Sequence, residues 1–180
     1  MRAGIEIEFL LGCDCRFSFE NIQMTLEAPS TFCVGATPYQ LVEFSNYGIP
    51  STARSVLASF LQRRITPIIT HPERIAKLAG NLELLRSFRE MGCMIQITAN
   101  ALWGYWGDSV KRSALAMLGA GLVDVVATDA HDMVRRPPEL NKAYDFIRRR
   151  YSEELADALC RATPGLIFGQ QRVAECLSVA

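Results

Sequence analysis

Short apolar, β-rich runs alternate with longer amphipathic runs along the whole chain. The apolar runs predict strands over Ile5–Leu11, Gln40–Ser45, Thr66–Thr70, Cys93–Thr98 and Val123–Thr128. The spacing of apolar residues predicts helices over Ser51–Arg64, Asn81–Met91, Ser109–Leu118 and Pro138–Arg150, one from Ser152 to about Arg161, and a short one from Thr163. Glu20–Thr37 is the least regular segment. This succession favours an α/β fold with a parallel sheet or barrel.

The length and the net charge of the chain limit the classes of function that it can have. A chain of 180 residues suits one domain, which we place over residues 1–180. Lys plus Arg equals Asp plus Glu at 19 each, so no basic excess is left to bind a nucleic acid. No apolar run approaches the ~20 residues of a membrane span, and acidic residues interrupt the apolar start. We therefore expect no nucleic-acid partner, no membrane span and no signal peptide.

The six cysteines form no CxxC pair and none lies near a histidine in the sequence. A zinc or redox site is one interpretation of Cys13-x-Cys15. Small buried apolar side chains in a reducing cytosol are the favoured one. A thiolate nucleophile of the kind used by cysteine phosphatases is not expected.

Polar residues collect at the ends of the expected strands. Glu6 lies in the first strand and Glu43 near the end of the second, while His71 follows the third. Asp129 and His131 follow the last strand. In folds with parallel strands, sites gather at the carboxyl ends of the strands, so we expect these side chains to meet.

The Asp129-x-His131 pair suits a metal site, because side chains two apart on an extended segment point the same way. Carboxylate oxygen with imidazole suits Mn, Fe or Zn. The alternative is a histidine that bonds a loop backbone beside an aspartate that caps a helix. Glu6, Glu43 and His71 at the other strand ends favour the metal.

Cations follow two of these strands. Arg74, three residues after His71, could bind a phosphate with its planar guanidinium, or form a surface ion pair with Glu73 or another neighbour. Arg135 and Arg136 could supply a second cation, and solvated loop charges are an equal alternative.

Residues 101–107 form an aromatic, glycine-spaced loop after the fourth expected strand. Packing of the core is the favoured interpretation of its rings. The alternative is a wall on which an aromatic substrate stacks.

Four runs together resemble a known family. They are Leu-Val-Glu-Phe-Ser at 41–45, Pro-Ile-Ile-Thr-His-Pro-Glu-Arg at 67–74, Gln-Ile-Thr-Ala-Asn-Ala-Leu-Trp-Gly at 96–104, and Ala-Thr-Asp-Ala-His at 127–131 followed by Arg136-Pro137. The sequence resembles the PHP-domain (polymerase and histidinol phosphatase) tyrosine phosphatases of bacterial capsule and exopolysaccharide operons, from Gly4 to about Gln170.

The resemblance implies a distorted (βα)7 barrel with a multinuclear manganese site, for which Fe or Zn are alternatives. It implies a cytoplasmic phosphoric monoester hydrolase that removes phosphate from tyrosines of a tyrosine autokinase controlling polysaccharide synthesis. Carried over by motif, the metal ligands would be Glu6, Glu43, His71, Asp129 and His131. Arg74 and Arg136 would hold the phosphate and act in catalysis. The alternatives are a phosphatase for a small phosphomonoester and a non-catalytic binding protein.

The family pattern begins with an HxH strand and a further ligand histidine ahead of the Gly-x-Glu-Ile segment. This chain has only Met1, Arg2 and Ala3 ahead of Gly4. We therefore expect an N-terminally incomplete barrel. We also expect the apolar strands Ile65–Thr70 and Val123–Thr128 to lie close to water or to another molecule, and the chain to self-associate into a homo-oligomer or aggregate.

Overall fold

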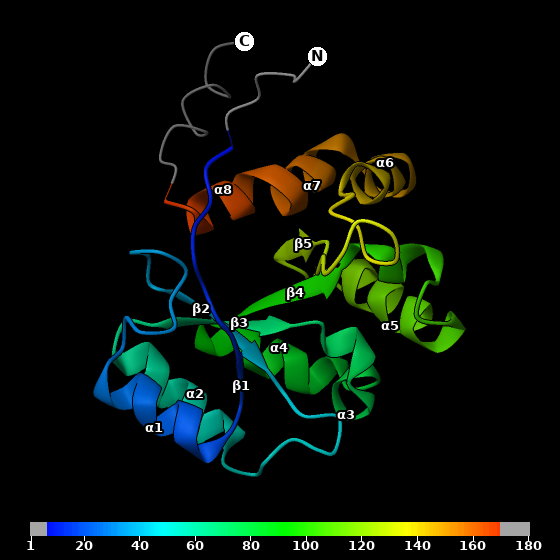
Figure 1. The fold of residues 1–180 in the computed structure, drawn as a ribbon. Coiled ribbons are helices and arrows are strands. Elements are labelled where there is room, and N and C mark those ends of the chain that lie inside the picture. The colour runs from blue at the N-terminus through cyan, green and yellow to red at the C-terminus, as the bar shows by residue number, and fades with distance from the viewer. Residues whose placement is uncertain (1–6, 170–180) are drawn as a thin grey trace.

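The computed structural model describes residues 7–169 of the chain, and these form one parallel five-stranded sheet with helices on both sides (Figure 1). The strands are β1 (Asp14–Arg16), β2 (Tyr39–Glu43), β3 (Thr66–Thr70), β4 (Met94–Thr98) and β5 (Val125–Ala127). The helices are α1 (Phe19–Glu27), α2 (Ala53–Gln62), α3 (Ala76–Ala79), α4 (Leu82–Met91), α5 (Asp108–Gly119), α6 (Asn141–Arg150), α7 (Glu153–Asp157) and α8 (Thr163–Ile167). Two 3₁₀ turns, η1 (Pro72–Arg74) and η2 (Ala99–Trp103), and a π turn, η3 (Ala158–Ala162), complete the elements.

The strands lie in the sheet in the same order as in the sequence, and every neighbouring pair is parallel. No strand order reversal of the doubly wound type is present among residues 7–169. Sequential parallel strands place all five carboxyl ends at one edge of the sheet. The α/β class with a parallel sheet is therefore confirmed. The sheet is open within these residues, with β1 and β5 at its edges, so the closed barrel is not confirmed.

The two faces of the sheet carry cores of different size. In the view of Figure 1, α1 to α4 lie below the sheet, and α7 and α8 lie above it. The larger core contains alternate strand residues such as Val42, Ile69 and Val126 with apolar side chains of the helices. The smaller core, on the opposite face, contains Ile68 and Val125 together with Ile167 of α8 and Val34.

The buried strands correct one expectation. Ile68 and Ile69 are 1% and 0% exposed, and Val125 and Val126 are 5% and 1% exposed. The expectation that these strands lie close to water is wrong, because α8 and the segment before β1 cover the second face of the sheet.

Most helices form where the sequence predicts them. Asn81 caps α4 by accepting a hydrogen bond from the Leu84 N–H at 3.0 Å, and Gly92 ends that helix with φ 108°. Ser152 likewise caps α7 by accepting from the Leu155 N–H at 3.1 Å.

Two elements differ from the prediction near the N-terminus. The first strand is Asp14–Arg16 rather than Ile5–Leu11, of which Ile5 and Glu6 lie outside the described residues. The segment expected to be irregular contains α1, whose N-cap Ser18 accepts from the Asn21 N–H at 3.3 Å. Apolar periodicity missed α1 because Thr25 is its one fully buried residue.

No helix among residues 7–169 is long and apolar enough to cross a membrane.

One ion pair holds the amino ends of β4 and β5 against α4. Arg89 of α4 binds Asp124 through two hydrogen bonds, Nε to Oδ2 at 3.0 Å and Nη2 to Oδ1 at 2.7 Å. The same carboxylate accepts from the Ile95 N–H at 2.8 Å, and Arg89 also donates to the Gly121 carbonyl. This network joins α4, β4 and the turn before β5.

At the opposite edge a buried carboxylate holds η1 against β4. Glu73 is 1% exposed, and its Oε1 accepts from the Thr98 N–H at 2.9 Å. Burial raises the pKa of the Glu73 carboxyl, and the hydrogen bond from Thr98 only partly opposes that effect. Glu73 stands between His71 and Arg74, so it fixes the turn that carries both.

We predict that Arg89→Ala lowers the free energy of unfolding by about 2 kcal/mol, because it leaves the Asp124 carboxylate without its charged partner. Chemical denaturation measures the loss. Arg86→Ala on the same helix is the matched control, since its pair with Glu83 is exposed and worth about 0.5 kcal/mol or less. Equal effects of the two substitutions would contradict a structural role for the Arg89–Asp124 pair.

We predict that Glu73→Gln reduces the pH dependence of stability. A carboxyl whose pKa is raised in the folded state binds more protons folded than unfolded. Its contribution is fully present below its unfolded pKa of about 4.3 and is lost as pH rises through the folded value. The unfolding free energy of the wild type should therefore fall relative to that of Glu73→Gln as pH rises. Parallel curves in urea titrations at several pH values would refute this.

We predict that the chain self-associates as its concentration rises. Ile7, Phe9 and Leu11 are 66%, 83% and 90% exposed and precede the edge strand β1. Size-exclusion chromatography with light scattering at several concentrations measures this, and Phe9→Lys should shift the distribution toward monomer. A wild-type monomer at every concentration would disprove the prediction.

Candidate active site

The candidate site lies where the carboxyl ends of the strands meet. Glu43 is the last residue of β2, and His71 directly follows β3. Asp129 and His131 lie in the loop after β5, and Asp14 begins β1. The structure divides these side chains into two groups.

The first group surrounds the His71 imidazole, which we call the histidine group. Its Nε2 lies 3.5 Å from Asp14 Oδ2 and 3.5 Å from Glu43 Oε1. The side chain of His71 is 6% exposed, whereas the two carboxylates are about one third exposed. Thr70 orients Asp14 by donating from Oγ1 to Asp14 Oδ1 at 3.0 Å. The group therefore brings one nitrogen and two carboxylates from three adjacent strands together.

The second group, which we call the arginine group, surrounds the Asp129 carboxylate. Arg74 Nη1 donates to Asp129 Oδ2 at 2.6 Å, and Arg136 Nη2 donates to the same oxygen. The guanidinium carbons lie 4.7 Å and 5.3 Å from the ring centroid of Trp106, so both cations lie over one indole face. Both arginine side chains are 19% exposed. Arg74 thus pairs with Asp129 rather than with Glu73.

A folded loop positions Arg136. Asp132 Oδ1 accepts from the backbone N–H groups of Val134, Arg135 and Arg136, which lowers the pKa of its carboxyl. The His131 N–H donates to the Arg136 carbonyl at 3.0 Å and closes the loop. The loop is therefore held by its own hydrogen bonds before any ligand binds.

Two site residues adopt left-handed backbone conformations that side chains usually avoid. His71 has φ 35° and Asp129 has φ 51°. Such conformations cost about 1–3 kcal/mol each and cluster at functional sites. Pro72 follows His71 at the start of η1 and helps to fix the turn.

His131 shows the loop contact that the sequence left open as an alternative. Its Nδ1 lies 2.9 Å from the Asp129 carbonyl oxygen and 3.7 Å from Asp129 Oδ1, and the side chain is 58% exposed. Glu6, the remaining predicted ligand, lies outside the described residues.

The donor atoms fit a divalent ion in chemistry but are not assembled around one. Within the described part of the chain, no three His, Cys, Asp or Glu side chains are grouped as a metal site requires. The two groups nevertheless share a space, since Asp14, Gln96 and Asp129 all line one cavity of about 480 Å³. Apolar side chains, among them Ile68, Val125 and Ile167 of the smaller core, form most of the rest of its wall.

Sequence reasoning missed five residues that shape the site. The alternation of exposed and buried residues along a strand could have identified Asp14, because Asp14 is exposed and the next residue, Cys15, is buried. The sequence identifies Trp106 only as part of an aromatic loop. Nothing in the sequence singles out Thr70, Glu73 and Asn100. Thr70 and Glu73 act through hydrogen bonds to distant segments. Asn100 acts through the hydrogen bond that fixes Trp106.

The cysteines take no part in the site. Burial raises the pKa of Cys15 to about 11, of Cys93 to about 12 and of Cys160 to about 11. Cys33 is also buried with a raised pKa, and Cys13 is exposed. All five are free thiols, and Cys176 lies outside the described residues. The prediction of small buried side chains is confirmed for four of these five.

Comparison with known proteins identifies the relatives of this chain. The family model described as "Capsular polysaccharide synthesis, CpsB/CapC" matches residues 1–168. The putative tyrosine-protein phosphatase CapC of Staphylococcus aureus is 32% identical over 143 residues, which are 79% of this chain and 55% of that protein. The tyrosine-protein phosphatase CpsB of Streptococcus pneumoniae is 33% identical over 140 residues, or 75% of this chain and 58% of that protein.

A solved structure shows the same fold. It comes from work on YwqE of Bacillus subtilis and CpsB of S. pneumoniae, described as unique metal-dependent tyrosine phosphatases. The TM-score is 0.79 at 27% identity, over 90% of this chain and 65% of the other. The chain thus spans between about half and two thirds of the length of these relatives. The match confirms the resemblance seen in the motifs, and the chain belongs to the CpsB/CapC family of capsular polysaccharide synthesis proteins.

Proposed function

We propose that this chain is a metal-dependent protein-tyrosine phosphatase, a phosphoric monoester hydrolase. The observation that carries the proposal is the convergence of two guanidinium groups on one oxygen of Asp129. Two fixed cations beside an aromatic ring suit a phosphate dianion, which brings more charge and more acceptor atoms than one carboxylate does.

The free hydrogen-bonding capacity of the arginine group supports an anionic ligand. Arg136 Nε is buried and has no partner among residues 7–169. A phosphoryl group that replaced the Asp129 carboxylate between the two arginines could accept from this N–H as well. Phosphate binding would also release Asp129, the residue that the motifs predict as a metal ligand.

The chain's own residues then have distinct roles. Arg74 and Arg136 bind the phosphoryl oxygens and neutralise the charge that develops on them. Trp106 supports both guanidiniums and excludes water from their inner side. His71 Nε2 faces the two carboxylates of Asp14 and Glu43, so it can hold a proton or a metal ion between them.

For the cofactor we propose Mn²⁺, with Fe and Zn as alternatives that suit the same donors. Glu43, His71, Asp129 and His131 would be ligands, as would Glu6, and the geometry adds Asp14. When bound, such an ion lowers the pKa of a coordinated water and polarises a phosphoryl oxygen. The support is the donor chemistry of the histidine group and the description of YwqE and CpsB as metal-dependent phosphatases.

The substrate we propose is a phosphotyrosine of a tyrosine autokinase that regulates capsular or exopolysaccharide synthesis. The family description and the tyrosine-protein phosphatase names of the relatives support it. We place this activity in the cytoplasm, since all five described cysteines are free thiols. We also propose that residues 1–180 act as one domain, built on a sequential parallel sheet of the kind that lines a barrel.

A second candidate function is phosphotyrosine binding without hydrolysis. The described residues contain an arginine group ready for an anion but no assembled metal group. Binding and turnover therefore have to be measured separately.

We predict that Arg74→Ala lowers kcat/KM on an aryl phosphate by about a hundredfold or more in the presence of Mn²⁺, because one donor to a developing oxyanion is worth about 3–4 kcal/mol. The affinity for Mn²⁺, measured by calorimetry without substrate, should stay unchanged. Arg112→Ala, an exposed arginine on α5, is the control and should retain full activity. An unchanged rate in Arg74→Ala would show that Arg74 only forms a structural ion pair.

Two treatments separate the mechanisms. A chelator should abolish turnover, and iodoacetamide should leave it intact, because burial raises the pKa of the core thiols and the exposed Cys13 has no role in the proposed mechanism. Tight phosphotyrosine binding with no turnover at any metal concentration would favour the second candidate. Loss of turnover on alkylation at unchanged metal content would refute metal-dependent hydrolysis.

A further inference from the structure

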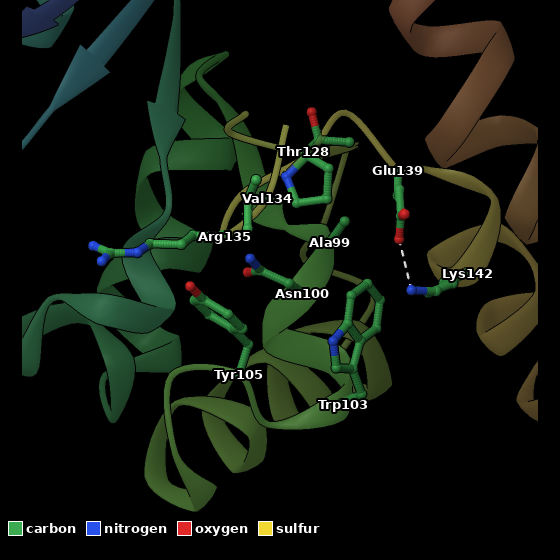
Figure 2. A pocket seen from close by; sticks show the side chains of 10 residues that line it. Ala99, Asn100, Trp103, Tyr105, Thr128, Val134, Arg135, Glu139 and Lys142 are labelled. Atoms are coloured by element: carbon green, nitrogen blue, oxygen red, sulfur yellow. Dashed lines mark ion pairs between the residues drawn. The ribbon is translucent and has the colours of Figure 1, made fainter. Parts of the chain in front are cut away.

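A second pocket lies directly beside the arginine group. It has a volume of about 230 Å³ and lies between η2 and the loop after β5 (Figure 2). Its lining includes Asn100, Trp103, Tyr105 and Pro137. The site described above uses none of these rings, so the pocket has no role in binding the phosphate itself.

Two half-exposed aromatic rings stand in the mostly polar lining of this pocket. Trp103 and Tyr105 are 40% and 46% exposed, and Figure 2 shows their rings on either side of Asn100. A cavity of about 150 Å³ is enough for benzene, so a space of about 230 Å³ can take the ring of an aromatic side chain. Aromatic pairs in such contacts contribute about 0.5–1.5 kcal/mol beyond the area that they bury.

The charged side chains of the pocket lie away from the space between its two rings. Lys142 forms an ion pair with Glu139 at 2.6 Å. Figure 2 shows the guanidinium of Arg135 directed away from Trp103.

One buried polar group also faces the pocket. Asn100 is 9% exposed and its Oδ1 accepts from Trp106 Nε1 at 2.6 Å. Among residues 7–169, the Nδ2 group of Asn100 donates no hydrogen bond to another protein atom. The pocket thus combines aromatic walls with one free donor, which suits a ring that carries an acceptor oxygen.

The same residues connect the pocket to the phosphate-binding arginines. Asn100 fixes Trp106, over which Arg74 and Arg136 lie. Thr128 and Arg135 line the pocket. Thr128 directly precedes Asp129 in the chain, and Arg135 directly precedes Arg136, so both adjoin the arginine group. Adjacent Cα atoms are about 3.8 Å apart, so a peptide with phosphate on the arginines can reach the pocket with a nearby side chain.

We propose that this pocket binds an aromatic side chain of the substrate peptide, within three positions of the phosphotyrosine. The inference rests on the proposed phosphotyrosine function and assigns Trp103 and Tyr105 as residues that determine peptide specificity. A tyrosyl ring is preferred over a phenyl ring, because its hydroxyl oxygen can accept from Asn100 Nδ2.

The test measures binding by fluorescence anisotropy on the full chain. Labelled peptides carry a central phosphotyrosine or tyrosine, and a tyrosine, phenylalanine or alanine at each flanking position in turn. At the preferred position, tyrosine should bind about tenfold more tightly than alanine. It should bind about threefold more tightly than phenylalanine, the value of one neutral hydrogen bond.

Variants assign the effect to the pocket. Trp103→Ala should reduce the affinity for the aromatic peptide to that of the alanine peptide and leave the alanine peptide unchanged. Trp103→Phe, which keeps a ring, should retain most of the preference. Tyr151→Ala is the control, because that ring has similar exposure at the end of α6 and does not line the pocket.

The outcomes separate the two proposals. A flanking preference that persists without any preference for phosphate supports the pocket and contradicts the phosphotyrosine function. A phosphate preference with no flanking preference overturns the pocket and leaves the phosphotyrosine function intact. Equal weakening of both peptides by Trp103→Ala, or no peptide binding at all, also overturns the pocket.

Discussion

The interaction on which the candidate site depends is the shared ion pair of Arg74 and Arg136 with Asp129. The arginines come from η1 and from the loop after β5, and one carboxylate oxygen holds both. Trp106 lies beneath the two guanidiniums and is fixed in turn by Asn100. Without the carboxylate two like charges would repel at this spacing, so Asp129 keeps the cations together.

The parallel sheet makes this meeting possible. The strands end at the same edge, where Glu43 ends β2, His71 follows β3 and Asp129 lies in the loop after β5, while Asp14 of the edge strand β1 reaches His71. The opposite edge has a structural role, with the Arg89–Asp124 pair joining α4 to β4 and the turn before β5. Of the three non-glycine residues with positive φ among residues 7–169, His71 and Asp129 lie at the site edge and Arg64 precedes β3.

In the function that we propose, the histidine and arginine groups divide the chemistry of phosphate ester hydrolysis between them. One offers donors for a metal ion or a proton, and the other offers cations for the phosphoryl oxygens. Both open to the same cavity, through Asp14 and Asp129. The aromatic pocket that Asn100 lines is connected to the arginine group through the hydrogen bond between Asn100 and Trp106.

The sequence by itself determined the α/β class, most helices and the strands β2 to β5, because apolar periodicity and capping residues are local properties. It also identified Glu43, His71, Asp129 and both arginines as strand-end residues. It placed the first strand too early and missed α1, whose apolar face buries little. Only the tertiary structure decided which side chains meet: Asp14 with His71, two arginines on one carboxylate, and Asn100 on Trp106. The arginines lie 62 residues apart in the chain, and their meeting follows from strand register and loop conformation rather than from local sequence.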